Sequence, residues 1–272
     1  MPNAYHVITD RILASLDKGD IPWRKPWTTS RPTNLDSRPY HGINAIVLGM
    51  SGYCDPRWLT YRKAASLGGH VRKGENSTPI VFWKNIEKKD EDESFWLLRY
   101  YSVFNIEQTK GLKLPALEIP NARHEPISMA ENIISNMPNR PSISHDGGNQ
   151  AYYRPSTDSI HLPSESTFHG PEHYYSTLFH EAGHSTGHES RLNRHNMETG
   201  IAAFGTATYS KEELVAEFGA AFLCHESSIE NTIENSTAYI QGWSKAIGRD
   251  KRLVITAASL GEKAANYIVG VN

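Results

Sequence analysis

The segment STLFHEAGHSTGHES, residues 176–190, constrains this chain more than any other stretch. Residues 180–184 read HEAGH and fit the pattern H-E-x-x-H. Residues four apart share one face of an α-helix, so the imidazoles of His180 and His184 can reach a single metal ion. Glu181 is then placed to accept a proton from water at that ion. The pattern predicts the metal centre and general base of a metallopeptidase.

The competing interpretation is a helix that only carries solvated histidines. The surrounding sequence favours the metal centre, because Gly170-Pro171 is a plausible helix start. An apolar face for burial follows it, formed by Tyr175, Leu178, Phe179 and Ala182. We therefore expect a buried helix that holds its histidines in fixed positions.

A zinc ion in such a site needs a third protein ligand and an open fourth position. His188 continues the spacing of four, but three ligands from one straight helix give poor tetrahedral geometry. The metzincin pattern fails too, because its third histidine would fall at Ser190. A carboxylate from another helix is the better candidate.

Residues 210–223, SKEELVAEFGAAFL, predict that second helix. Its apolar face consists of Leu214, Val215, Phe218, Ala221 and Phe222. Glu213 and Glu217 lie one turn apart, so one can bind the metal while the other orients a ligand histidine. Ser210 and Glu213 also fit a capping box, which would engage Glu213 with the backbone and make Glu217 the ligand. The residues alone leave this choice open.

Charge and composition divide the chain. Residues 1–112 contain 16 Lys and Arg against 12 Asp and Glu, whereas residues 113–272 contain 12 against 18. Most tryptophans lie in the first part, and residues 113–126, KLPALEIPNARHEP, have the composition of a linker. We expect an N-terminal domain over 1–112, a linker over 113–126 and a C-terminal domain over 127–272, with different partners.

Local patterns predict an α+β fold for both domains. In the first, the apolar spacing over residues 5–16 predicts a helix, TYRKAASLGG a short helix, and PIVFWK and FWLLRYYSVFN two strands around a solvated loop at 87–93. In the second, the capping-box pattern of Ser128 and Glu131 predicts the first helix. We expect residues 158–163, DSIHLP, to form an edge strand that pairs with an extended substrate.

Aromatic and cationic side chains alternate in the first domain. Aromatic rings can stack on unpaired bases while cations follow the phosphates, which favours binding to single-stranded DNA. The alternative is that the aromatic residues form the core, and Trp96 is the first candidate for that role. The residues expected to bind DNA are Trp23, Arg24, Lys25, Trp27, Tyr61, Arg62, Lys63, Arg72, Lys73 and Lys84.

The sequence also indicates the cellular compartment in which the protein works. No apolar run approaches the length of a membrane span, and the N-terminus lacks an apolar signal core. Cys54 and Cys224 are too few for a disulfide framework and are expected to be reduced packing residues. We expect a cytoplasmic protein with no membrane partner.

Both halves, in this order, resemble the plasmid antirestriction protein ArdC family over nearly the whole chain. The matching N-terminal segments are PWRKPW, YHGIN, WLTYRKAASLGGHVRKGE and VFNIEQTKGL, and the C-terminal ones are YYRPSTDSIHLP, YYSTLFHEAGHSTGHESRL and ELVAEFGAAFL. The first half also resembles the N-terminal part of conjugative-plasmid primases, which implies single-stranded DNA binding. The second half is similar to zincins with a glutamate ligand, which implies metal ligation by His180, His184 and Glu213, with Glu217 supporting a ligand.

The resemblance implies protection of incoming mobile DNA from host restriction and leaves the mechanism open. The chain could coat DNA, or its peptidase could cleave a restriction-related protein or a repressor. The ion is expected to be zinc, with manganese as a substitute. The DNA partner is expected to be single-stranded, with double-stranded DNA as a further possibility. His188 and Tyr209 are candidates for stabilising an oxyanion.

Overall fold

The structure is a computed structural model. It describes residues 3–24, 30–87, 94–115, 125–194, 207–233 and 237–271. The chain is α+β and divides into two compact units. The first comprises Met1–Pro22 and Pro26–Pro120, and the second comprises Trp23–Lys25 and Asn121–Asn272.

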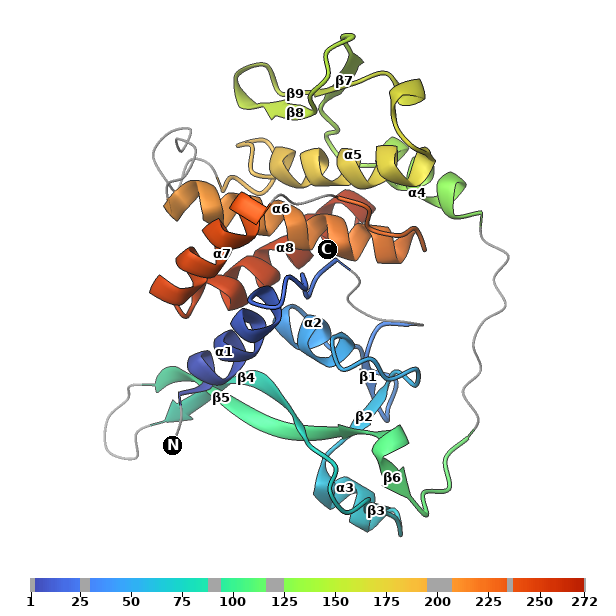
Figure 1. Cartoon of the computed structure of the whole chain (residues 1–272), viewed down its shortest axis with the longest axis vertical. Coiled ribbons are helices and arrows are strands. Elements are labelled where there is room, and N and C mark those ends of the chain that lie inside the picture. The colour runs from blue at the N-terminus through green and yellow to red at the C-terminus, as the bar shows by residue number, and fades with distance from the viewer. Residues whose placement is uncertain are drawn as a thin grey trace. The chain divides into compact units, whose positions relative to one another are not determined.

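The N-terminal unit is built on a long β-hairpin. Strands β4 (Thr78–Glu87) and β5 (Ser94–Asn105) pair antiparallel over their whole lengths, and the sheet order is β1-β2-β5-β4. Helices α1 and α2 contact β4, as Figure 1 shows. The remaining elements are α1 (Ala4–Leu16), β1 (Thr33–Asn34), α2 (Ile43–Gly49), β2 (Arg57–Leu59), α3 (Tyr61–Ser66), β3 (His70–Val71), a 3₁₀ turn (Ile106–Gln108) and β6 (Thr109–Lys110).

These elements follow from local sequence. The predicted helix over residues 5–16 is α1, and it buries Ile8, Ile12 and Leu16. The predicted TYRKAASLGG helix is α3, with the Thr60 side chain accepting a hydrogen bond from the Lys63 backbone at its start. Both predicted strands are confirmed as β4 and β5. The expected loop lies outside the described residues, and so does the side chain of Trp96.

A buried side chain completes the outer edge of this sheet. Strand β4 is the last strand, and the Asn44 amide takes the place of a neighbouring backbone. Its Nδ2 donates to the Val81 carbonyl at 2.7 Å, and the Val81 N–H donates to Oδ1 at 2.7 Å. Helix α2 is thereby fixed to the hairpin through two hydrogen bonds that water does not reach.

The C-terminal unit packs helices against a small sheet. Helix α5 contacts α6 as well as strands β8 and β9, and α6 also contacts α7 and α8 (Figure 1). Its elements are α4 (Pro126–Ser135), β7 (Ser142–His145), β8 (Tyr152–Arg154), a 3₁₀ turn (Pro155–Thr157), β9 (Ser159–Leu162), a 3₁₀ turn (Glu165–Thr167), α5 (Pro171–Ser185), α6 (Ala207–Glu226), α7 (Thr237–Arg249) and α8 (Leu253–Val269).

Helix α6 is buried on most of its surface because two glycines let its neighbours approach closely. The apolar face predicted for it is confirmed, with all five side chains in the core. A Cβ atom at Gly183 of α5 would lie 3.2 Å from the Ala216 Cα atom of α6. One at Gly261 of α8 would lie 2.5 Å from the Phe218 Cβ atom. Backbone packing at this distance sets the position of the acidic residues on α6.

Two local expectations were wrong, and one alternative left open is excluded. Strand β9 lies in the middle of its sheet, in the order β7-β9-β8, so it offers no free edge. Helix α4 begins at Pro126 with Glu125 as N-cap, so Ser128 lies inside the helix. Helix α6 begins at Ala207, which removes the capping-box role of Ser210 and Glu213. In both helices the capping pattern falls within the first turns, so each helix starts earlier than its pattern indicated.

The cysteines and the helices bear on the expected compartment. Cys224 is buried and packs in the core as expected, whereas Cys54 is exposed, and neither forms a disulfide. Among the described residues, none of the helices combines the length and the apolarity needed to cross a membrane.

Candidate metal centre

Helices α5 and α6 bring three potential ligands together. His180 and His184 lie one turn apart on α5, and their Nε2 atoms are 3.1 Å from each other. Glu213 of α6 lies opposite, with one carboxylate oxygen 3.6 Å from His180 Nε2 and the other 3.5 Å from His184 Nε2. Among the residues that the structure describes, they form the one group of this kind.

The spacing fits a tetrahedral ion. Ligand atoms bound at the usual zinc distances lie about 3.3 Å apart around a tetrahedral centre. The three separations observed here, 3.1, 3.5 and 3.6 Å, bracket that value. Three side chains contribute, which leaves the fourth position of a tetrahedral ion for water. The residues therefore fit a divalent ion of the zinc or manganese kind.

Carboxylates also face the far nitrogens of both imidazoles. Glu217 has an oxygen 3.7 Å from His180 Nδ1, and Glu212 has one 3.8 Å from His184 Nδ1. His180 Nδ1 is buried and has no hydrogen-bond partner. A small closing movement would turn the contact to Glu217 into the hydrogen bond that metal-bound histidines usually make.

Glu212 is a site residue that the sequence interpretation missed. Arg194 donates to Glu212 at 2.7 Å, to the Gly183 carbonyl at 3.0 Å and to the Thr186 hydroxyl at 2.6 Å. The guanidinium therefore fixes Glu212 beside His184 and ties it to the end of α5. The signal available in the sequence was the adjacency of Glu212 to Glu213, since neighbours on a helix can serve two different histidines.

The acidic surroundings change the titration of both histidines. Burial alone would lower the pKa of His180, but the carboxylates of Glu213 and Glu217 raise it to about 9. The pKa of His184 is also raised against the effect of burial, chiefly by Glu212 and Glu213. The environment thus favours positive charge at this point, and a cation satisfies the same carboxylates.

Glu181 is the residue expected to act as general base. Its side chain is 7% exposed and lies beside the ligand group on α5. No described residue holds its carboxylate in a hydrogen bond, so it can accept a proton. His188 lies beyond the end of α5 and contacts Ser190 through Nδ1 at 2.9 Å, apart from the three ligands. The side chain of Tyr209 is outside the described residues.

The residues expected to bind DNA are found in different places. Trp23 is fully buried and belongs to the C-terminal unit, where it packs against Phe218 and Trp243. In this position the indole cannot stack on a base, contrary to expectation. Arg24 is exposed in the same unit, and Lys25 and Trp27 lie outside the described residues. The other residues expected to bind DNA all lie exposed in the N-terminal unit; they are Tyr61, Arg62, Lys63, Arg72, Lys73 and Lys84.

One surface of the N-terminal hairpin combines exposed rings and cations. Phe82 and Lys84 of β4 lie on the same face as Arg99 and Tyr101 of β5, since strand residues alternate. Phe82 is 46% exposed and Tyr101 is 44% exposed, with ring centroids 6.0 Å apart. We call these four residues the aromatic–cationic face. The sequence interpretation included only Lys84, although the alternation in PIVFWK places Phe82 beside it.

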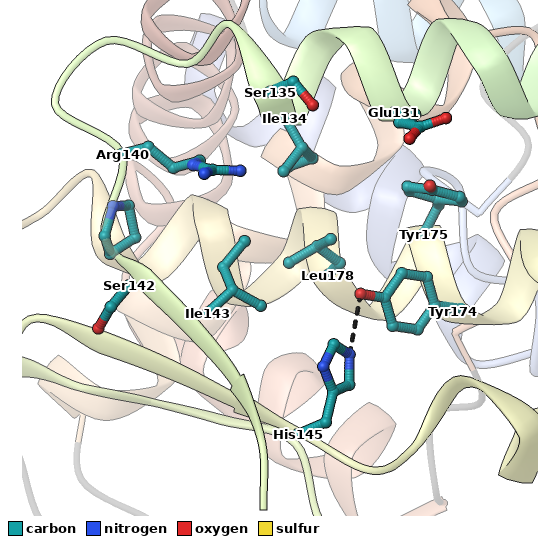
Figure 2. A pocket seen from close by; sticks show the side chains of 11 residues that line it. Glu131, Ile134, Ser135, Arg140, Ser142, Ile143, His145, Tyr174, Tyr175 and Leu178 are labelled. Atoms are coloured by element: carbon teal, nitrogen blue, oxygen red, sulfur yellow. Dashed lines mark hydrogen bonds between the residues drawn. The ribbon is translucent and has the colours of Figure 1, made fainter.

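A separate pocket lies on another side of α5. It has a volume of about 480 Å³, and Figure 2 shows Tyr174, Leu178 and His145 around it, with His145 Nε2 3.1 Å from the Tyr174 hydroxyl. Leu178 is two residues before His180, about 200° away around the helix. None of the three candidate ligands lines this pocket. The candidate ligand group and the pocket are therefore distinct.

Comparison with known proteins places the whole chain. Residues 2–120 match the N-terminal domain of anti-restriction factor ArdC, and residues 128–260 match a zincin-like metallopeptidase family. The chain is 36% identical to a DNA primase TraC of Escherichia coli, over 96% of this chain and 26% of the primase. It therefore spans about a quarter of that relative's length. It is also 33% identical to the uncharacterized protein y4eC of Sinorhizobium fredii, over 97% and 91% of the two chains.

Solved structures agree with this assignment. Crystal structures of the antirestriction ArdC protein from plasmid R388 superpose on this chain in a metal-free form (TM-score 0.81, 35% identity, 98% of both chains). The Mn(II)-bound form matches equally well (TM-score 0.80, 36% identity, 97% of this chain and 96% of that one). With both domains matched in order and the fold shared along the full length, the chain belongs to the ArdC family of antirestriction proteins.

Proposed function

We propose that this protein protects incoming mobile DNA from host restriction by binding it as a single strand. In the same chain, we propose, a metal-dependent peptidase centre acts on a protein. The observation that carries this proposal is the convergence of His180, His184 and Glu213 in a chain that matches ArdC along its whole length. Restriction enzymes and entering DNA meet in the cytoplasm, which is where the protein would act.

The aromatic–cationic face supports the DNA-binding part. Two exposed rings provide stacking surfaces, while Lys84 and Arg99 beside them provide charge for phosphates. Tyr61 of α3 is another exposed ring in this unit, at 60% exposure. Stacking is tolerant of sequence because every base has a π-face, so we propose little sequence preference.

Full-length protein and a labelled oligonucleotide test this part. Phe82→Leu should weaken binding, by about 1–3 kcal/mol if one base stacks there, whereas Phe82→Trp should retain it. Affinity should fall as salt rises, with a slope proportional to the number of phosphates contacted. Equal affinity of the Leu and Trp variants would exclude stacking on Phe82. Stronger binding to a duplex of the same sequence would point to double-stranded DNA as the partner.

The ligand group and Glu181 support the hydrolytic part. A bound zinc or manganese ion would supply the Lewis acidity that makes water a nucleophile at neutral pH. Glu181 would accept the water proton and deliver it to the leaving amine. Strand β8 contacts α5 and is an edge of its sheet, so we propose that an extended substrate pairs with Tyr152–Arg154.

Single substitutions separate ligand, base and binding roles. Alanine at His180, His184 or Glu213 should abolish metal uptake measured by elemental analysis, whereas Glu181→Gln should retain the metal. In the zinc-loaded protein, Glu181→Gln should abolish cleavage of a peptide library followed by mass spectrometry. Restriction protection of transferred DNA by the same variant decides between the mechanisms: its loss favours the peptidase, and its survival favours protection by DNA binding alone.

A further inference from the structure

A tryptophan from the start of the chain contacts the outer carboxylate of the metal centre. The Trp23 indole Nε1 donates a hydrogen bond to Glu217 Oε2 at 3.3 Å. The other oxygen of Glu217 faces His180 Nδ1 at 3.7 Å. A single chain of contacts thus runs from the indole, through the carboxylate, to a candidate ligand.

The surroundings hold this indole in place. Trp23 is 0% exposed, with its ring centroid 4.8 Å from that of Phe218 and 5.4 Å from that of Trp243. Glu217 is 2% exposed. A buried indole N–H needs an acceptor and a buried carboxylate needs donors, so this contact gives Trp23 its acceptor and Glu217 one donor. A neutral apolar ring at position 23 would fill the space without directing the carboxylate.

We infer that Trp23 is a positioning residue for the metal centre: its N–H fixes the Glu217 carboxylate in the orientation that supports His180 as a ligand. The inference rests on the proposed metal site and adds a residue that the N-terminal sequence contributes to it. Outer partners of ligand histidines are commonly worth 10–100-fold in metal affinity. Loss of the Trp23 donor should act through Glu217 and therefore weaken zinc binding by about tenfold.

The test measures zinc affinity by chelator competition in the full-length protein. Trp23→Phe should weaken binding about tenfold. Trp243→Phe is the matched control, since it also removes a buried indole in contact with the same core but leaves the Trp23–Glu217 hydrogen bond intact. In a Glu217→Ala background, Trp23→Phe should cause no further loss, because the carboxylate through which it acts is gone.

A second substitution separates positioning from packing. Replacing Trp23 by 3-benzothienylalanine keeps the ring shape and exchanges the N–H for sulfur, so it should weaken zinc binding as Trp23→Phe does while leaving the melting temperature of the metal-free protein close to that of the parent. Parental zinc affinity in this variant, or equal losses in Trp23→Phe and Trp243→Phe, would overturn the inference. Absence of both zinc and manganese binding in the parent would instead overturn the proposed metal centre.

Discussion

The close approach of α5 and α6 at Gly183 should matter more for the metal than for folding. In Gly183→Ala, the new Cβ would lie 3.2 Å from the Ala216 Cα, and relief of that contact needs a movement of a few tenths of an ångström. Overpacking of this kind costs about 1–3 kcal/mol, while alanine stabilises a helix interior by about 0.5–1 kcal/mol relative to glycine. The free energy of unfolding should therefore fall by about 0–2.5 kcal/mol.

For metal binding, the gain in helix propensity from alanine does not offset the displacement of the helix. Ala216 lies on α6 between Glu213 and Glu217, so displacement of α6 moves both carboxylates relative to the imidazoles of α5. Metal sites hold ligand distances to about 0.2 Å, and we expect zinc affinity to fall on the order of tenfold. Denaturant unfolding of the metal-free protein and chelator competition measure the two effects separately.

Gly242→Ala in α7 is the matched control. A Cβ there meets nothing within 4 Å, so the substitution should stabilise the protein by about 0.5–1 kcal/mol and leave zinc affinity unchanged. If Gly183→Ala binds zinc as tightly as the parent, the α5–α6 contact does not set the position of Glu213, and the geometric reasoning is refuted.

Three further predictions concern other parts of the molecule. Asn44→Ala should destabilise the protein by about 2–4 kcal/mol in denaturant unfolding, because it leaves the buried N–H and carbonyl of Val81 without hydrogen-bond partners. A loss under about 1 kcal/mol would show that water replaces the amide. Arg191 lowers the pKa of Asp158, so the stability from this pair should be present at neutral pH and be lost as pH falls from about 4 through that lowered pKa. Asp158→Asn should flatten this acid transition. An unchanged pH profile of unfolding in this variant would contradict the prediction. Glu212→Ala should weaken zinc binding, on the order of tenfold, by freeing His184 Nδ1, and equal affinity would show that Arg194 and Glu212 serve only the fold.

Local patterns predicted the elements that carry the chemistry. Helix α5 follows from Gly170-Pro171 and its apolar face, and α6 from a run of apolar residues with acidic ones between them. Position on a helix face is a local property, so the amino-acid sequence is enough to pair His180 with His184 and to offer Glu213 and Glu217 as candidates for the third ligand; the choice of Glu213 came from the resemblance to zincins with a glutamate ligand. The same reasoning could not rank Glu213 against Glu217, because that depends on which turn of α6 lies opposite α5.

Non-local pairing explains what was missed. Strand β9 looked like an edge, but its neighbours β7 and β8 come from short segments with weak patterns of their own. Trp23 is 194 residues from Glu217 in the chain, and its local sequence, rich in cations, favoured a nucleic-acid surface. The local sequence around an aromatic residue beside cations is the same whether its ring is buried or exposed, so only the fold could show that Trp23 is a core residue.

The membership of Trp23–Lys25 in the C-terminal unit changes what a nick in the chain would do. That unit resumes only at Asn121, so the polypeptide enters it early, leaves it and returns. A protease cutting within residues 113–126 would break the covalent connection there, yet the N-terminal fragment would keep its indole packed beside Phe218 and Trp243. The chain therefore passes between the two units at Pro22–Trp23 and at Lys25–Pro26 as well as near Pro120, so the linker is not the only covalent crossing between them.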